Sequence, residues 1–172
     1  MAYNAKAVAN YLLDLARVEG EPISPMKLQK LLYYAHGWHL AVTGEPLIRD
    51  TIEAWGYGPV VPAIYQDFKP FGNEPITSPA QDFGWDHGKV IVSTPEIPTG
   101  EAHETAREVL RRVWDIYKGR TALELSKMTH APGAPWSQTV APHGGRAPVG
   151  LEIPNRLIRN YFAQMGETGG AE

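Results

Sequence analysis

The 172-residue sequence contains no cysteine and carries no surplus of positive charge. Without cysteine the chain cannot form disulfides, cysteine-ligated zinc sites, iron–sulfur clusters or a thiol nucleophile. Its 16 lysines and arginines stand against 19 aspartates and glutamates, which gives a net charge of −3. Proteins that bind nucleic acid nonspecifically normally have a basic excess, so the composition disfavours nucleic acid as a partner.

Long hydrophobic runs are also missing. The longest uninterrupted apolar run covers residues 31–35, whereas a membrane-spanning helix needs about 20 apolar residues. The opening residues, Met-Ala-Tyr-Asn-Ala-Lys, are not followed by the apolar segment of a secretory signal peptide. We therefore expect a cytoplasmic protein without a membrane partner.

The patterns that are present are mostly helical. Many of the 17 glycines and 15 prolines fall within residues 56–100 and 132–154, where we expect loops and strands. Apolar periodicity elsewhere predicts helices, and two β-rich segments predict strands. The predicted helices cover residues 4–18, 25–43, 62–70, 100–118, 121–130 and 155–165, the strand candidates are 46–55 and 89–94, and residues 71–87 are predicted to be irregular.

The helix predicted at residues 25–43 is the centre of the expected fold. Ser24 suits an N-cap, Pro25 suits the first helical position, and Gly44 suits the C-terminal stop. Apolar side chains surround this helix on almost every side, which is typical of a buried element. The predicted class is α+β and predominantly α-helical, with about five or six helices around this helix and a small β-hairpin or short sheet.

The sequence shows no recognisable catalytic or cofactor motif. It has no phosphate-binding loop, no dinucleotide fingerprint and no nucleophile elbow. His36 and His39 are three residues apart without a neighbouring acid, so we interpret them as packing residues and not as metal ligands. We expect no enzyme, no cofactor and no metal, although residues distant in sequence could still converge into an active site.

Several aromatic residues lie on or beside the glycine- and proline-rich loop that follows the first strand candidate. Such residues either plug into the core or form a protein-binding surface, because Tyr and Trp provide large contact areas at low entropic cost. Tyr57 is the preferred contact residue because glycines flank it, and the lysines near the start of the central helix would steer an acidic partner. The candidate partner-binding residues are Lys27, Lys30, Tyr34, Glu53, Trp55, Tyr57 and Tyr65.

Two adjacent segments resemble a known family. Residues 26–40 (MKLQKLLYYAHGWHL) and 52–62 (IEAWGYGPVVP) are similar to the signature of the Panacea domain, which occurs in phage-associated GepA-like proteins and SocA-like antitoxins. The similarity returns in residues 121–130, in Pro135-Trp136 and in residues 153–162.

The resemblance implies a single Panacea-like domain over residues 1–165. Residues 166–172 are rich in glycine and offer little to bury, so we expect a flexible C-terminal tail there. The resemblance also implies an antitoxin that neutralises a cognate protein toxin by direct binding and, as in SocA-like members, delivers it to a Clp-type protease. Residues 72–100 match no family motif, and we hypothesise that they determine which toxin is recognised. The alternative is a DNA-binding transcriptional or phage regulator without catalytic activity. The oligomeric state stays open.

Overall fold

A computed structural model describes residues 1–169 of the chain. Within these residues the fold contains seven α-helices, three short 3₁₀ turns and two antiparallel two-stranded sheets, so the predicted α+β, mostly helical class is confirmed. The helices are α1 (Ala5–Glu19), α2 (Pro25–Thr43), α3 (Pro62–Phe68), α4 (Glu104–Tyr117), α5 (Ala122–Thr129), α6 (Pro135–Val140) and α7 (Asn155–Gly169). The strands are β1 (Glu53–Trp55), β2 (Gly58–Val60), β3 (Asp82–Asp86) and β4 (Lys89–Ser93), and the 3₁₀ turns are η1 (Lys69–Phe71), η2 (Glu101–His103) and η3 (Ala141–His143).

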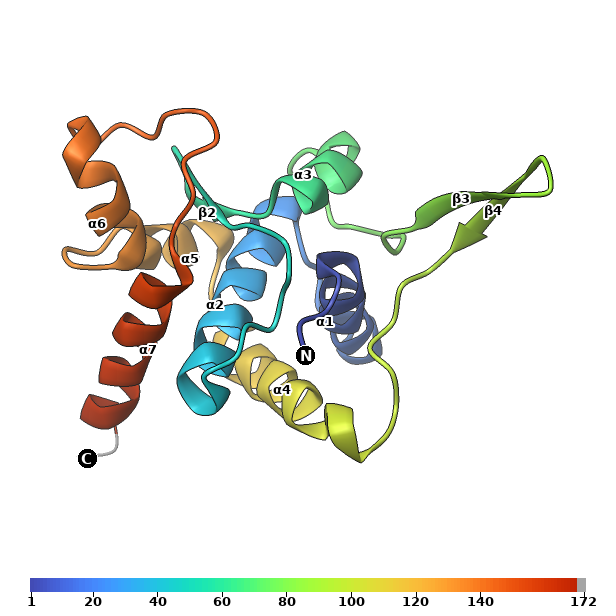
Figure 1. The fold of residues 1–172 in the computed structure, drawn as a ribbon, viewed down its shortest axis with the longest axis horizontal. Helices are drawn as coiled ribbons and strands as arrows, with labels where there is room; N and C mark the ends of the chain where they lie inside the picture. Colours follow the sequence, from blue (N-terminus) through green and yellow to red (C-terminus); the bar gives the residue numbers. More distant parts are fainter. Residues whose placement is uncertain (170–172) are drawn as a thin grey trace.

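Helix α2 runs through the middle of the molecule, as predicted (Figure 1). The Ser24 side chain accepts a hydrogen bond from the Lys27 backbone N–H, and Gly44 ends the helix in the left-handed conformation at φ 77°. Helices α1, α4, α5 and α7 all pack against α2. None of the helices within residues 1–169 is long and apolar enough to cross a lipid bilayer.

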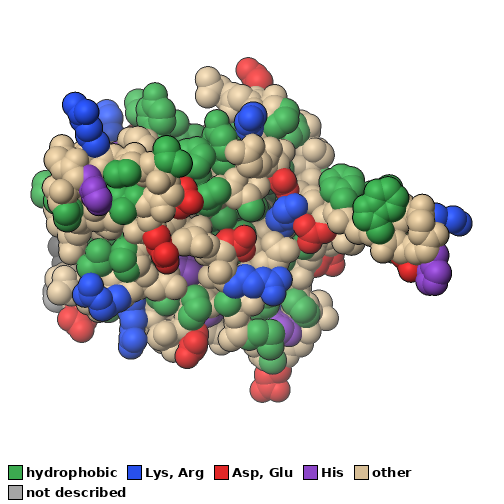
Figure 2. All heavy atoms as spheres, turned by 45° about the horizontal axis from the view of Figure 1, so that its top comes forward, with side chains coloured by type: hydrophobic (Ala, Val, Ile, Leu, Met, Phe, Trp, Pro, Cys, Tyr) green, Lys and Arg blue, Asp and Glu red, His purple; other side chains and the backbone are tan. Residues whose placement is uncertain are grey.

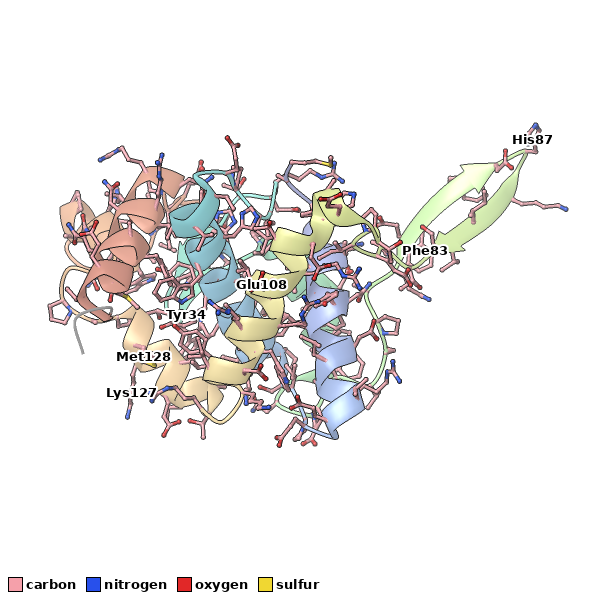
Figure 3. All side chains as sticks on the ribbon, turned by 90° about the horizontal axis from the view of Figure 1, so that it is seen from below. Tyr34, Phe83, His87, Glu108, Lys127 and Met128 are labelled. Atoms are coloured by element: carbon pink, nitrogen blue, oxygen red, sulfur yellow. The ribbon has the colours of Figure 1, made fainter. Side chains whose placement is uncertain are left out.

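An aromatic cluster joins α2 to the helices that cover it. The Tyr34 ring stacks on Tyr117 of α4 with a centroid separation of 4.4 Å, and Phe162 of α7 meets Tyr34 edge to face. Gly37 permits the close approach of α7, because a Cβ atom at this position would lie 2.3 Å from the Phe162 ring. Figure 3 shows Tyr34 between these helices.

The C-terminal helix is longer than the sequence indicates. We expected it to end at Met165, but α7 continues to Gly169, so residues 166–169 of the predicted tail are helical. Gly166 remains close to the core, since a Cβ there would lie 3.6 Å from the Trp38 ring, and Thr168 Oγ1 donates to the carbonyl of Gln164. The rest of the predicted tail lies outside the described residues.

A second correction concerns residues 71–87, which were predicted to be irregular. Strand β3 lies within this segment and pairs with β4, from Asp82 opposite Ser93 to Asp86 opposite Lys89. We name this hairpin, residues 82–93, the arm; it projects away from the helices (Figure 1). Its strands bury neither face, which explains why β3 lacks the alternation of a half-buried strand.

The root of the arm is fastened to α1. The buried amide side chain of Asn10 binds both the N–H and the carbonyl of Ala80, and also the carbonyl of Pro95, at 2.8 to 3.0 Å. These two residues precede β3 and follow β4, so one side chain holds both legs of the hairpin. Lys6 adds ion pairs to Asp82 at 3.0 Å and Asp67 at 3.1 Å.

Candidate protein-binding surface

The strongest candidate site is the connection between β1 and β2, residues 55–58, which we name the Tyr57 turn. Gly58 has φ +113°, and a Cβ atom there would lie 2.6 Å from Thr129 Oγ1 and 2.9 Å from Lys30 Nζ. Glycine is therefore required at this position both for the backbone conformation and for the close approach of α5.

Side chains from α5 and α6, together with the cap of α5, bind three consecutive carbonyl oxygens of the Tyr57 turn. The partners are Trp136 Nε1 with Trp55 O at 2.7 Å, His130 Nε2 with Gly56 O at 3.1 Å, and Ser126 Oγ with Tyr57 O at 2.7 Å. Each contact joins segments about 70 to 80 positions apart in the chain. The turn is thus held by the body of the protein.

Helix α2 supports the same hairpin from below. Lys30 Nζ donates to the carbonyl of Pro59 at 3.1 Å, and the Gln29 amide pairs with both backbone groups of Val61 at 2.8 and 3.1 Å. The Lys30 side chain is only 1% exposed, and this burial lowers its pKa to about 7. The amine fixes the β2 backbone from inside the protein.

A pocket of about 360 Å³ opens between the Tyr57 turn, the first turns of α2, and α3. Its apolar walls come from Met26, Trp55, Tyr57, Ile64 and Tyr65. Trp55 and Tyr65 meet edge to face with ring centroids 4.8 Å apart, while Tyr57 is 72% exposed. Hydrophobic side chains are visible over this part of the surface, above β2 and α3 (Figure 2).

The structure therefore brings four of the predicted contact residues, Lys30, Trp55, Tyr57 and Tyr65, to a single pocket, although Lys30 is only 1% exposed. Glu53 has a supporting position, because its Oε2 accepts a hydrogen bond from Trp55 Nε1 at 2.8 Å. Its carboxylate orients the indole beside the pocket.

Lys27, Lys30 and Tyr34 make contacts within the fold. Lys30 is buried beneath the turn, and Tyr34 is buried between α4 and α7. Burial also raises the pKa of the Tyr34 hydroxyl. Lys27 points toward α4 and donates to the carbonyl of Lys118 at 2.5 Å. All three side chains therefore have partners inside the protein, and Lys30 also borders the pocket.

Sequence reasoning missed part of this surface and all of its support. Met26 and Ile64 line the pocket, but the sequence singles out neither as a contact residue. Ser126, His130 and Trp136 were noticed only as family-like motifs. Their roles depend on a tertiary contact with the turn, which no local pattern reveals.

The histidines of α2 have structural partners. His36 Nδ1 accepts from the Ile48 N–H at 3.2 Å, and its Nε2 lies 2.8 Å from Asn155 Oδ1, so the ring is held neutral; burial lowers its pKa to about 4. His39 Nδ1 binds the carbonyl of Glu45 at 2.8 Å, and burial lowers its pKa as well.

Helix α2 is also poorly placed to read DNA. Most of its residues are buried, and its polar side chains Lys27, Gln29 and Lys30 bind backbone groups of the protein. A recognition helix must offer such groups to base edges in the major groove. The geometry supports a protein-binding surface better than a DNA-binding one.

Similar sequences occur among known proteins. Residues 28–137 match the family described as antitoxin SocA-like, Panacea domain. This match covers residues 28–43 of the central helix, the Tyr57 turn and the three side chains that hold it. The chain is also 38% identical over 161 residues to Antitoxin SocA of Caulobacter vibrioides (strain NA1000 / CB15N), covering 92% of this chain and 82% of that protein. No solved structure matches the chain.

Proposed function

Because the chain belongs to the SocA-like antitoxin family with a Panacea domain, we propose that it neutralises a cognate protein toxin by binding it at the Tyr57 pocket. The chain would act as the antitoxin of a toxin–antitoxin pair, in the cytoplasm and without catalysis of its own. The single observation that supports the location is an exposed tyrosine on a turn whose backbone is held by the fold.

The held turn favours tight binding for an entropic reason. A flexible loop loses conformational freedom when it binds, whereas a loop already fixed in its bound shape avoids much of that cost. The hydrogen bonds from α5, its cap and α6 to three carbonyl oxygens of the turn, together with the hydrogen bond from Lys30 to the Pro59 carbonyl, fix this turn before any partner binds. The pocket beside Tyr57 is apolar and large enough for a bulky side chain of the toxin.

The experiment begins with the toxin. The protein encoded by the neighbouring reading frame is expressed alone, and growth arrest that this chain reverses identifies it as the partner. Tyr57→Ala should then weaken binding by roughly 2 kcal/mol, a typical loss at an interface hot spot, and should reduce rescue. The melting temperature should stay near that of the wild type, because the Tyr57 ring is mostly exposed.

The matched control is Ile116→Ala. Ile116 is an exposed apolar residue on α4, outside the residues that line the pocket, so its loss should leave binding unchanged. If Tyr57→Ala binds the toxin normally, the proposed location is wrong. A large drop in melting temperature with normal rescue would instead make Tyr57 a core residue.

Neutralisation can proceed by blocking the toxin or, as the family resemblance suggests, by delivering it to a Clp-type protease. The two modes differ in the half-life of the toxin, which delivery shortens only in cells that contain the protease. The alternative function, operator binding by a regulator, predicts a specific gel shift at physiological salt.

A further inference from the structure

The arm exposes apolar side chains that nothing in residues 1–169 covers. Phe83 is 72% exposed and Trp85 78%, and Val90, Ile91 and Val92 are each about half exposed. Phe83 lies opposite Val92, and Trp85 opposite Val90, so these four residues share one face of the hairpin. Figure 3 shows the arm from Phe83 near its root to His87 at its tip, extending beyond the helices.

Each edge of a two-stranded hairpin also carries backbone groups without a strand partner, and the register identifies them. His87 and Gly88 form a two-residue turn with φ 47° and 78°, so Asp86 and Lys89 are the hydrogen-bonded pair that closes it. Hydrogen-bonded and non-bonded pairs then alternate along the ladder. On β4, the N–H and C=O groups of Val90 and Val92 therefore point outward.

The two edges differ in whether they can pair with themselves. An antiparallel pair of β3 strands centred on Gly84 would place Asp82 opposite Asp86 of the other copy, twice, and like charges directly opposite each other are destabilising. An antiparallel pair of β4 strands centred on Ile91 places Lys89 opposite Ser93. The charges thus disfavour β3 and permit β4.

We propose that strand β4 of the arm pairs with β4 of a second copy of this chain, around a two-fold axis at Ile91. In this register the outward N–H and C=O groups of Val90 face those of Val92 in the second copy, and the groups of Val92 face those of Val90 in the second copy. Each of these two pairs makes two backbone hydrogen bonds, four in all. The two Ile91 residues form the non-bonded pair at the centre, where side chains approach most closely.

The paired arms form a four-stranded sheet in the order β3, β4, β4, β3. The valines of both copies then lie at the centre of one face, between the Phe83 and Trp85 rings of either copy, and lose exposed area. Asn10 keeps the legs of the arm in place before association, which reduces the ordering cost. A five-residue strand pair is a small interface, so we expect a weak, concentration-dependent dimer.

The absence of cysteine allows a direct test of the register. Ile91→Cys should form an interchain disulfide under mild oxidation, because Cα atoms of a non-bonded antiparallel pair lie about 4.5 Å apart, within disulfide range. Gly84→Cys is the matched control: it lies opposite Ile91 on β3 and should not crosslink at the same rate. Equal crosslinking of both variants would overturn the proposed register.

Sedimentation of the unmodified full chain at rising concentration provides the second test. We expect a monomer–dimer equilibrium that Val90→Pro weakens at least tenfold, because this change removes an outward N–H and spares the bonds between β3 and β4. Tyr57→Ala should leave the dimer unchanged, so failure here is distinct from failure of the proposed function. The proposal would be overturned if the wild-type chain stays monomeric at every concentration. It would also be overturned if the Val90→Pro variant dimerises as well as the wild type and instead loses toxin binding.

Discussion

Replacing Lys30 with methionine should make the protein more stable at neutral pH and less stable at alkaline pH. Lys30 is buried beneath the Tyr57 turn, its amine donates to the carbonyl of Pro59, and burial lowers its pKa to about 7 from 10.5. No ion pair within residues 1–169 offsets that burial. Methionine has a similar length and no charge.

The magnitude follows from the two pKa values. A lowering from 10.5 to about 7 corresponds to a cost of about 5 kcal/mol for holding the charged amine in the folded protein. Between pH 7 and 10.5 the unfolded chain keeps its proton while the folded protein releases it, so wild-type stability rises with pH in this window. The variant also leaves the Pro59 carbonyl without its donor, which costs about 1 to 3 kcal/mol at any pH.

These contributions predict a change of sign. At pH 7 the Lys30→Met variant should be more stable than the wild type by about 2 to 4 kcal/mol; at pH 10 most of the charge cost is gone, and the variant should be less stable. Urea unfolding of both proteins at pH 7, 8.5 and 10 measures the difference. If the variant is less stable by the same amount at every pH, then Lys30 does not titrate in the folded protein and its buried charge was misjudged.

Two further changes test the packing of the same region and of α2. Gly58→Ala should destabilise the protein by on the order of 3 kcal/mol in urea unfolding, because alanine is strained at this positive φ and its Cβ overlaps Thr129. If a second change, Thr129→Ala, restores all of the lost stability, the strain at positive φ contributes nothing. His36 has a folded pKa of about 4 against 6.5 when unfolded, so stability should fall as pH drops from 6.5 to 4, by up to about 3 kcal/mol. His36→Gln should flatten that slope, and an unchanged slope would mean that other groups cause it.

Helices with local start and stop signals could be predicted closely from sequence. Ser24, Pro25 and Gly44 bound α2 at the predicted residues. The Thr-Ala-Leu-Glu sequence at the start of α5 is typical of a capping box, and the structure contains one: the Thr121 hydroxyl accepts from the Glu124 N–H, and the Glu124 carboxylate accepts from the Thr121 N–H. Such signals depend on neighbours within one turn, so tertiary structure does not alter them.

Features that depend on distant contacts could not be predicted. The polarity of Lys30 indicated a surface residue, but α2 is enclosed on nearly all sides and the turn supplies a carbonyl acceptor. Strand β3 has no buried face and therefore no periodicity to detect. The aromatic turn was recognisable from its glycines, whereas its supporting side chains on α5 and α6 were not.

Every bond that holds the Tyr57 turn from α5, α6 and Lys30 ends on a backbone oxygen of the hairpin. The shape of the turn is therefore independent of the side chain that it displays at position 57. Mutations at this position leave those hydrogen bonds in place. Under the proposed function, such an antitoxin can acquire a new toxin target by single substitutions at position 57, whereas substitutions of Gly58 or of the buried donors disturb the fold.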